Sequence, residues 1–254
     1  MVHTGVLTGL LLLSLFSSVL SVQKVDLNTL HRIIRVFETR FVQTPGHQYA
    51  VAINVPAGQC GAGFNENNFL SSEEANKVKN DLNDDTKRLY TGRQMVAAKP
   101  KGRGSNAIHS ERILLMCEDS SQAVTPMQNL LNTGDRNGCV VFYTYNSPCL
   151  DYCLNQVNDN NLKNWEKVQK EKGKMNVPPA VEKCILNSLS ILTNHPGPKA
   201  FVFSQVYDKD TKNTELLAPA LKEVAEKVPL YKCNTNSCIE CLDNNNNFNS
   251  QCLS

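Results

Sequence analysis

The chain has 254 residues, of which 41% are apolar and 20% are charged. This composition is close to that of ordinary globular proteins, and it excludes a wholly disordered chain, a collagen-like chain and a multi-span membrane protein. Lysine and arginine total 26 and aspartate and glutamate 24, so the formal net charge of +2 implies no particular partner.

The N-terminus has the pattern of a secretory signal peptide. Residues 1–23 contain no Asp, Glu, Lys or Arg, and leucines crowd residues 10–15. Ser21 ends a small-residue cleavage site. We therefore predict that residues 1–21 are removed and that the mature chain is secreted, without stable membrane association. A retained signal anchor is the alternative, because the uncharged stretch is just long enough to span a bilayer.

The first half of the chain predicts alternating helices and strands. Residues 25–41 carry apolar side chains every three or four positions, which is typical of an amphipathic helix. Residues 49–55 form a short apolar run bounded by proline and glycine, which is typical of a buried strand. Further predicted elements are a polar helix through 83 opened by a Ser71/Glu74 capping box, a strand at 95–98, a helix at 109–116, and a helix at 126–131 capped by Thr125.

The second half continues the alternation. Its clearest strand is 139–145, and Ser147-Pro148 then has the pattern of a helix start. Further predicted elements are a helix opened by Pro178-Pro179, a strand at 200–206, a helix at 216–227 and a last strand at 228–231. The whole pattern predicts one domain at 22–232, a three-layer α-β-α fold with a mixed central sheet of about five strands. Residues 233–254 form an Asn-rich and Cys-rich tail with too few apolar residues for a core of their own.

Two short motifs, each at the start of a predicted helix, carry the chemistry. One is His109-Ser110-Glu111, and the other is Pro148-Cys149 followed by Cys153. A catalytic zinc site needs three nitrogen or sulfur ligands and one open position for water, and His109, Cys149 and Cys153 supply that set. Cysteines four apart in a helical turn point to one face, and a helix N-terminus favours the thiolate. Glu111 is too close to His109 to join the same ligand set, but it is well placed to exchange protons with water on the metal.

Together these motifs resemble the H-x-E and P-C-x-x-C signature of zinc-dependent nucleoside and nucleic-acid deaminases. The element order over 49–231 is similar to that of the same superfamily, and secretion together with Ser147-Pro148-Cys149 is most similar to the secreted AID/APOBEC-like deaminases of animals. The resemblance implies a deaminase fold and Zn²⁺ as the cofactor. It also implies that Glu111 is the catalytic acid and base in converting cytosine to uracil, in single-stranded nucleic acid or in a free nucleoside.

The sequence departs from the family pattern at several positions that bear on substrate binding. Three residues rather than two separate the motif cysteines. Residue 146 is asparagine where related enzymes commonly have tryptophan, so Tyr145 becomes the candidate substrate-facing aromatic. Related enzymes also hold the sugar with a loop asparagine upstream of the histidine, for which Asn54 and Asn106 are candidates.

Two basic segments are candidates for phosphate contacts. Six basic residues with no acid lie between 87 and 103, and Arg103 stands nearest the His109 motif. This run would contact phosphates if it lined the substrate groove, and a solvated loop is equally consistent with it. In the Lys-rich stretch 158–174, we expect Trp165 to anchor an insert to the core rather than to stack on a base.

The ten cysteines leave alternatives open. In an oxidising compartment most cysteines pair, so Cys149 and Cys153 could belong to disulfides instead of a zinc site. The four tail cysteines include a C-x-x-C, for which we favour disulfides over a second zinc site because no histidine accompanies them. An inactive binding or structural module on a deaminase scaffold remains the alternative to an enzyme. The oligomeric state is not predicted.

Overall fold

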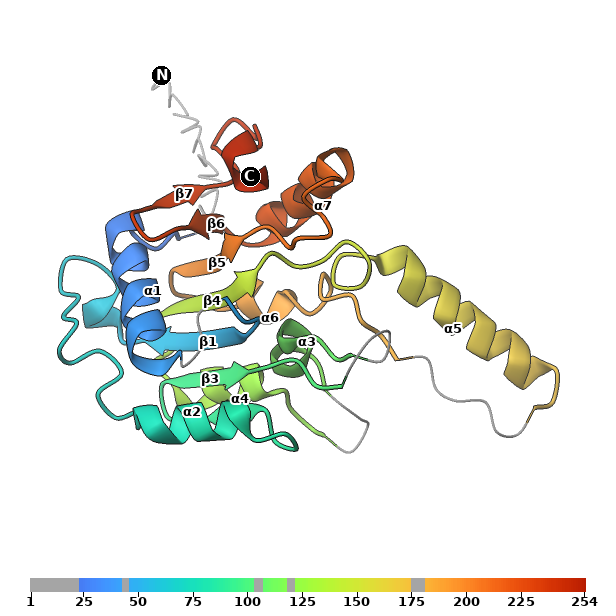
Figure 1. Cartoon of the computed structure of the whole chain (residues 1–254), viewed down its shortest axis with the longest axis horizontal. Coiled ribbons are helices and arrows are strands. Elements are labelled where there is room, and N and C mark those ends of the chain that lie inside the picture. The colour runs from blue at the N-terminus through green and yellow to red at the C-terminus, as the bar shows by residue number, and fades with distance from the viewer. Residues whose placement is uncertain (1–22, 43–45, 103–106, 118–121, 175–180) are drawn as a thin grey trace, which may run out of the picture.

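A computed structural model describes residues 23–42, 46–102, 107–117, 122–174 and 181–254. Its centre is a mixed sheet with the strand order β2-β3-β1-β4-β5-β6-β7 (Figure 1). The neighbouring pairs β4·β5 and β5·β6 are parallel, and the other pairs are antiparallel. The strands are β1 (Ala50–Val55), β2 (Leu89–Thr91), β3 (Met95–Ala98), β4 (Cys139–Asn146), β5 (Lys199–Gln205), β6 (Leu230–Cys233) and β7 (Cys238–Glu240).

Helices cover both faces of this sheet, which confirms the three-layer α-β-α fold (Figure 1). One face packs on α1 (Leu27–Phe41) and α2 (Ala75–Asn83). The other face packs on α3 (Ser110–Leu115), α4 (Pro126–Thr133), α6 (Ser190–Thr193) and α7 (Thr214–Lys227). The sheet has seven strands rather than the predicted five, because the three-residue strands β2 and β7 are too short to show a period in the sequence.

Strand β4 explains how the sequence builds this core. Successive side chains of a strand point to opposite faces of the sheet. Val141 and Tyr143 accordingly join the cluster under α1, whereas Val140 and Phe142 join the cluster under α3 and α7. Because both faces are buried, the sequence of this strand is an almost continuous apolar run.

The predicted start of α4 is confirmed, whereas that of α2 is wrong. Asp26 caps α1 by accepting a hydrogen bond from the Thr29 amide at 2.8 Å. Thr125 and Gln128 form the capping box of α4, whose first residue is a proline. The predicted Ser71/Glu74 box is wrong, since α2 begins at Ala75 with Glu74 as its N-cap.

The helix predicted at Ser147-Pro148 is also wrong. Residues 150–154 form a turn instead, closed by a 3.0 Å hydrogen bond from the Leu154 amide to the Cys149 carbonyl. The next helix, α5 (Gln156–Glu171), begins only after Asn155 caps it. This helix extends away from the body of the protein (Figure 1). Its Trp165 is 50% exposed, so the prediction that this side chain anchors an insert to the core is wrong.

The helix predicted from Pro178-Pro179 is much shorter than expected. Residues 175–180 lie outside the described part of the chain. After them the only helix before β5 in the described residues is the four-residue α6. The rest of the apolar run, including the buried Ile185 and Leu189, packs into the core without forming a long helix.

The tail is part of the same sheet. Its β7 pairs antiparallel with β6, and the short helix η3 (Ser250–Leu253) lies against α7. Disulfides Cys233–Cys238 and Cys241–Cys252 join the four tail cysteines in pairs, which confirms the disulfide interpretation over a second zinc site. A third disulfide, Cys60–Cys139, ties the loop after β1, with its short helix η1 (Ala57–Gln59), to the start of β4.

The segment predicted as a signal peptide, residues 1–21, lies outside the described residues. Among the helices that are described, none is both long enough and apolar enough to cross a membrane.

Loss of the Cys60–Cys139 bridge should destabilise the fold strongly. Its two cysteines are 79 positions apart, and closing a loop of that length removes unfolded-state entropy worth about 4.5 kcal/mol. We expect the double variant Cys60→Ala/Cys139→Ala to lose about that much free energy of unfolding in urea titrations. Cys117→Ala, which removes a half-buried free thiol, is the control. An unchanged urea midpoint in the double variant would contradict the prediction.

Candidate active site

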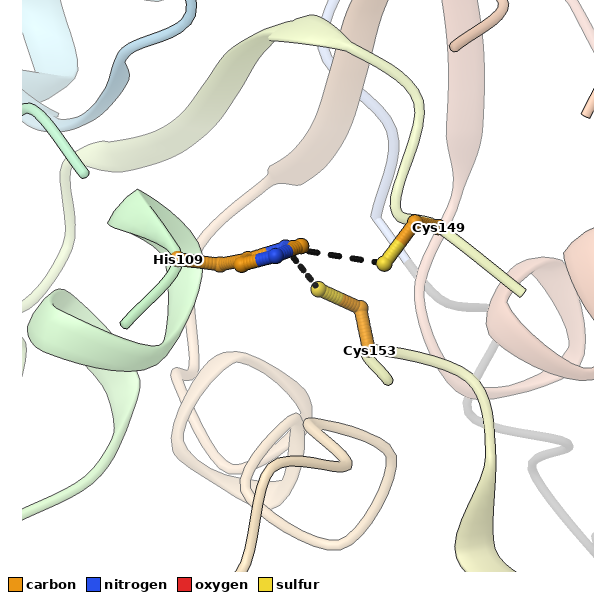
Figure 2. A group of neighbouring side chains, drawn as sticks. All are labelled: His109, Cys149 and Cys153. Carbon is orange, nitrogen blue, oxygen red and sulfur yellow. Dashed lines mark hydrogen bonds between the residues drawn. The ribbon is translucent and has the colours of Figure 1, made fainter. Parts of the chain in front are cut away.

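The two motifs meet where β4 ends. His109 is the N-cap residue of α3, in the connection that follows β3. Cys149 lies three residues beyond the end of β4, and Cys153 lies within the turn that follows. Figure 2 shows the imidazole ring pointing at both sulfurs. Its Nδ1 atom lies 3.5 Å from Cys149 Sγ and 3.2 Å from Cys153 Sγ.

These three side chains fit a metal ion. Their ligand atoms all lie within 4.8 Å of one another. Zinc bonds of 2.0–2.3 Å in a tetrahedron place a nitrogen and a sulfur ligand about 3.5 Å apart, which is close to both observed distances. Both sulfurs are free thiols, so the alternative that they belong to disulfides is wrong. One nitrogen and two sulfurs form the soft donor set typical of zinc, and three protein ligands leave a fourth position for water.

Hydrogen bonds from neighbouring elements hold the cysteine turn in place. The Leu150 amide donates to Asp210 Oδ2 at 3.0 Å, and the Ile185 amide donates to the Cys153 carbonyl at 2.9 Å. Tyr152, inside the turn, meets the His109 ring edge-on with the ring centroids 5.6 Å apart. The spacing of the two sulfurs is therefore set by tertiary contacts and not by helical periodicity.

The side chains of His109, Cys149 and Cys153 also shift one another's pKa values. A hydrogen bond from Cys153, and then one from His109, lowers the pKa of the Cys149 thiol to about 4. The same bond to Cys149, together with burial, raises the pKa of Cys153. The hydrogen bond with Cys149 raises the pKa of His109. The site thus favours a thiolate at Cys149, which is the form that binds a metal.

Glu111 is a buried carboxyl group beside this cluster, with 1% of its surface exposed. Its Oε1 atom accepts hydrogen bonds from Gln48 Nε2 at 2.9 Å and from Thr144 Oγ1 at 3.0 Å. Its Oε2 atom accepts one from Ser110 Oγ at 3.1 Å. Burial is the largest cause that raises the pKa of Glu111, so this carboxyl group takes up a proton more readily than an exposed one.

A small cavity opens onto this group. Its volume is about 160 Å³, below the ~300–1,000 Å³ of pockets for drug-sized ligands, so it suits a single planar ring. The residues that line it include His109, Glu111, Cys149, Gln48, Asn146 and Tyr207.

The structure does not bring two of the predicted substrate-binding residues to this cavity. Asn54 lies at the opposite end of β1, where its side chain bonds both the amide and the carbonyl of Asp135 at 2.9 and 3.0 Å. Tyr145 points to the α1 face, because it alternates along β4 with Thr144, which faces Glu111. Tyr145 instead lines a separate cavity of about 470 Å³. The other two candidates, Arg103 and Asn106, lie outside the described residues.

Three members of the basic run contact other residues of the protein. Lys87 pairs with Asp81 at 2.8 Å, and Arg88 pairs with Asp85 at 2.5 Å. Lys99 donates to Asn83 Oδ1 at 2.6 Å. These contacts give no support to a phosphate-binding groove along this run.

Three residues that line the cavity or bind the Glu111 carboxyl group were not predicted from the sequence. Thr144 could have been found, because it lies on the same face of the predicted strand as residues 140 and 142 and near the end that leads to Cys149. Tyr207 follows β5, whose parallel pairing with β4 brings its end to the same edge of the sheet. Gln48 belongs to no motif, and its role depends on folding that no local pattern reveals.

The family model described as Secreted Novel AID/APOBEC-like Deaminase 1 matches residues 27–177 and 173–254. Searches of curated proteins and of solved structures found no match. The two matched segments span nearly all of the chain after the predicted signal peptide, and the chain belongs to this family of AID/APOBEC-like deaminases.

Proposed function

We propose that the chain is a zinc-dependent hydrolytic deaminase that converts cytosine to uracil. The observation that carries the proposal is the position of Glu111, a buried carboxyl group that shares one small cavity with His109 and Cys149. A proton-transfer group and a soft metal-ligand set in one cavity are the two parts that hydrolysis of an aromatic amine requires.

The proposed roles of the residues follow from their chemistry. His109, Cys149 and Cys153 would hold the ion, and the chemistry that zinc supplies at such a site is the activation of water at neutral pH. Glu111 would take a proton from the attacking water and deliver protons to the ring nitrogen and the departing amine. Water adds at C4, the C4–N bond breaks, and ammonia leaves with a carbonyl in its place.

The size of the cavity restricts the form of the substrate. A site that admits one ring cannot act on a base that is stacked and paired in a duplex. A free nucleoside and an unpaired base of a single strand both meet this condition. We therefore propose cytosine in one of these two forms, and the assay below separates them.

We also propose that the protein acts outside the cell. The support is the signal-like pattern of residues 1–21 together with three disulfides, which form and persist in oxidising compartments. The printed description of the matching family also contains the word secreted.

Uracil formation tests the proposed reaction. Purified protein with stoichiometric zinc is incubated separately with cytidine, single-stranded DNA and single-stranded RNA, and uracil is measured by mass spectrometry. We expect uracil from at least one substrate, with none from Glu111→Ala. If the zinc-loaded protein and this variant are equally inert on all three substrates, the chain is an inactive module on a deaminase scaffold.

A further inference from the structure

Gln48 connects three elements around the proposed proton-transfer group. It lies two residues before β1, and its half-buried side chain lines the small cavity. Its Nε2 atom is 2.9 Å from both Glu111 Oε1, on α3, and Thr144 Oγ1, on β4. One side chain therefore joins the start of β1 to the helix that carries Glu111 and to the strand that leads to Cys149.

The orientation of the Gln48 amide is fixed by a backbone group. The Asn146 amide donates to Gln48 Oε1 at 2.9 Å, and a backbone N–H can only donate. The oxygen of Gln48 must therefore face Asn146, which leaves its NH₂ group facing Glu111 and Thr144. If the amide were flipped, its NH₂ group would face the Asn146 N–H, which is also a donor. Its oxygen would then face the Glu111 carboxylate, which is also an acceptor.

The two carboxylate oxygens of Glu111 accept hydrogen bonds from different partners. Oε1 accepts from Gln48 and from Thr144, whereas Oε2 accepts from Ser110 among the described residues. The hydrogen bond from Gln48 therefore holds the carboxyl group at Oε1 and not at Oε2.

We infer that Gln48 is a positioning residue, which holds the Glu111 carboxyl group through Oε1 in its place at the small cavity. The inference rests on the proposed deaminase function. Gln48 acts through Glu111, so its loss should slow the chemical step without weakening metal binding. Residues that orient an active group in this way change activity by about 10–100-fold when they are replaced.

Two substitutions separate hydrogen bonding from packing. Gln48→Met keeps a similar side-chain length and removes the amide, and Gln48→Glu keeps the acceptor for Asn146 but puts a negative charge against Glu111. We expect both variants to lower kcat by about 10–100-fold, with KM changed by less than about twofold and the zinc content unchanged. Gln251→Ala, at an exposed glutamine in η3, should match wild type. A wild-type kcat in Gln48→Met would overturn the inference, and so would a loss confined to KM.

A measurement independent of activity distinguishes failure of this inference from failure of the proposed function. In ¹⁵N-labelled protein, the Gln48 side-chain NH₂ signals are assigned by their absence in Gln48→Met. A proton donated to a carboxylate resonates downfield, so these signals should move upfield in Glu111→Ala. If they move and the wild type makes no uracil, the contact stands and the deaminase proposal falls. If they do not move, Gln48 does not hold Glu111 and the inference is overturned.

Discussion

Replacing Glu111 by glutamine should lower kcat for cytosine deamination by about 10²–10⁴-fold, the range that positioned acid–base groups contribute. Glutamine keeps the length of the side chain, and its amide oxygen can still accept the bonds from Gln48 and Thr144. It cannot take up and release a proton at neutral pH. Zinc content should stay near one per chain, because Glu111 is not among the three ligand side chains.

A buried glutamate elsewhere provides the matched control. Glu73 is 5% exposed, and it accepts hydrogen bonds from the Tyr90 hydroxyl and, at 2.6 Å, from the Gln94 amide. Glu73→Gln should lower the melting temperature but leave kcat at the wild-type value, since the side chain does not line the cavity. Steady-state kinetics and metal analysis of both variants make the comparison. If Glu111→Gln keeps kcat within about tenfold of wild type, another group transfers the proton.

The layered fold could be predicted because its strands are buried on both faces. Such strands are continuous apolar runs, and the predicted strand 95–98 coincides with β3 while 139–145 falls within β4. The short strands β2 and β7 could not be predicted in this way. They join the sheet by pairing with β3 and β6. A strand of three residues is too short to show an alternation of apolar and polar side chains in the sequence.

The turn at Cys149 shows where local patterns fail. Ser147 followed by proline is a good helix start by local criteria. In the structure the Ser147 hydroxyl accepts a hydrogen bond from the Tyr207 amide at 3.1 Å, and the Leu150 amide binds Asp210. Both partners come from the loop after β5, about 60 residues away. Tertiary contacts thus replace the helical hydrogen bonds, and the two sulfurs still face one point.

Some residues of the site could be predicted from local sequence patterns, and others could not. His109, Cys149 and Cys153 belong to two short sequence motifs, and the structure brings them together with Glu111 in one place. Asn54 is a candidate only because related enzymes use an asparagine upstream of the histidine, and the pairing of β1 with β4 places it at the far end of β1. Gln48 could not be proposed, because its contacts arise only when three separate elements meet.

Removing a sulfur ligand should abolish zinc binding and the stability that zinc supplies. In Cys153→Ala we expect the zinc content to fall from about one per chain to near zero after dialysis, because two remaining ligands do not form a zinc site. A ligand that binds only the folded state stabilises it by about 4 kcal/mol when present at 1,000 times its dissociation constant. The melting temperature of the variant should fall correspondingly, as measured by calorimetry in zinc-containing buffer.

The fall in melting temperature has a second source, because Cys153 is fully buried and its loss also leaves a small void. Cys184→Ala is the matched control, since Cys184 is a free thiol, 7% exposed, in the same core cluster and outside the ligand group. It should lose a little stability and keep its zinc. EDTA separates the two effects, since it should lower the melting temperature of wild type and Cys184→Ala but leave Cys153→Ala unchanged. An equal EDTA effect on all three proteins would show that zinc binds elsewhere, and the proposed chemistry at Glu111 would then lose its metal.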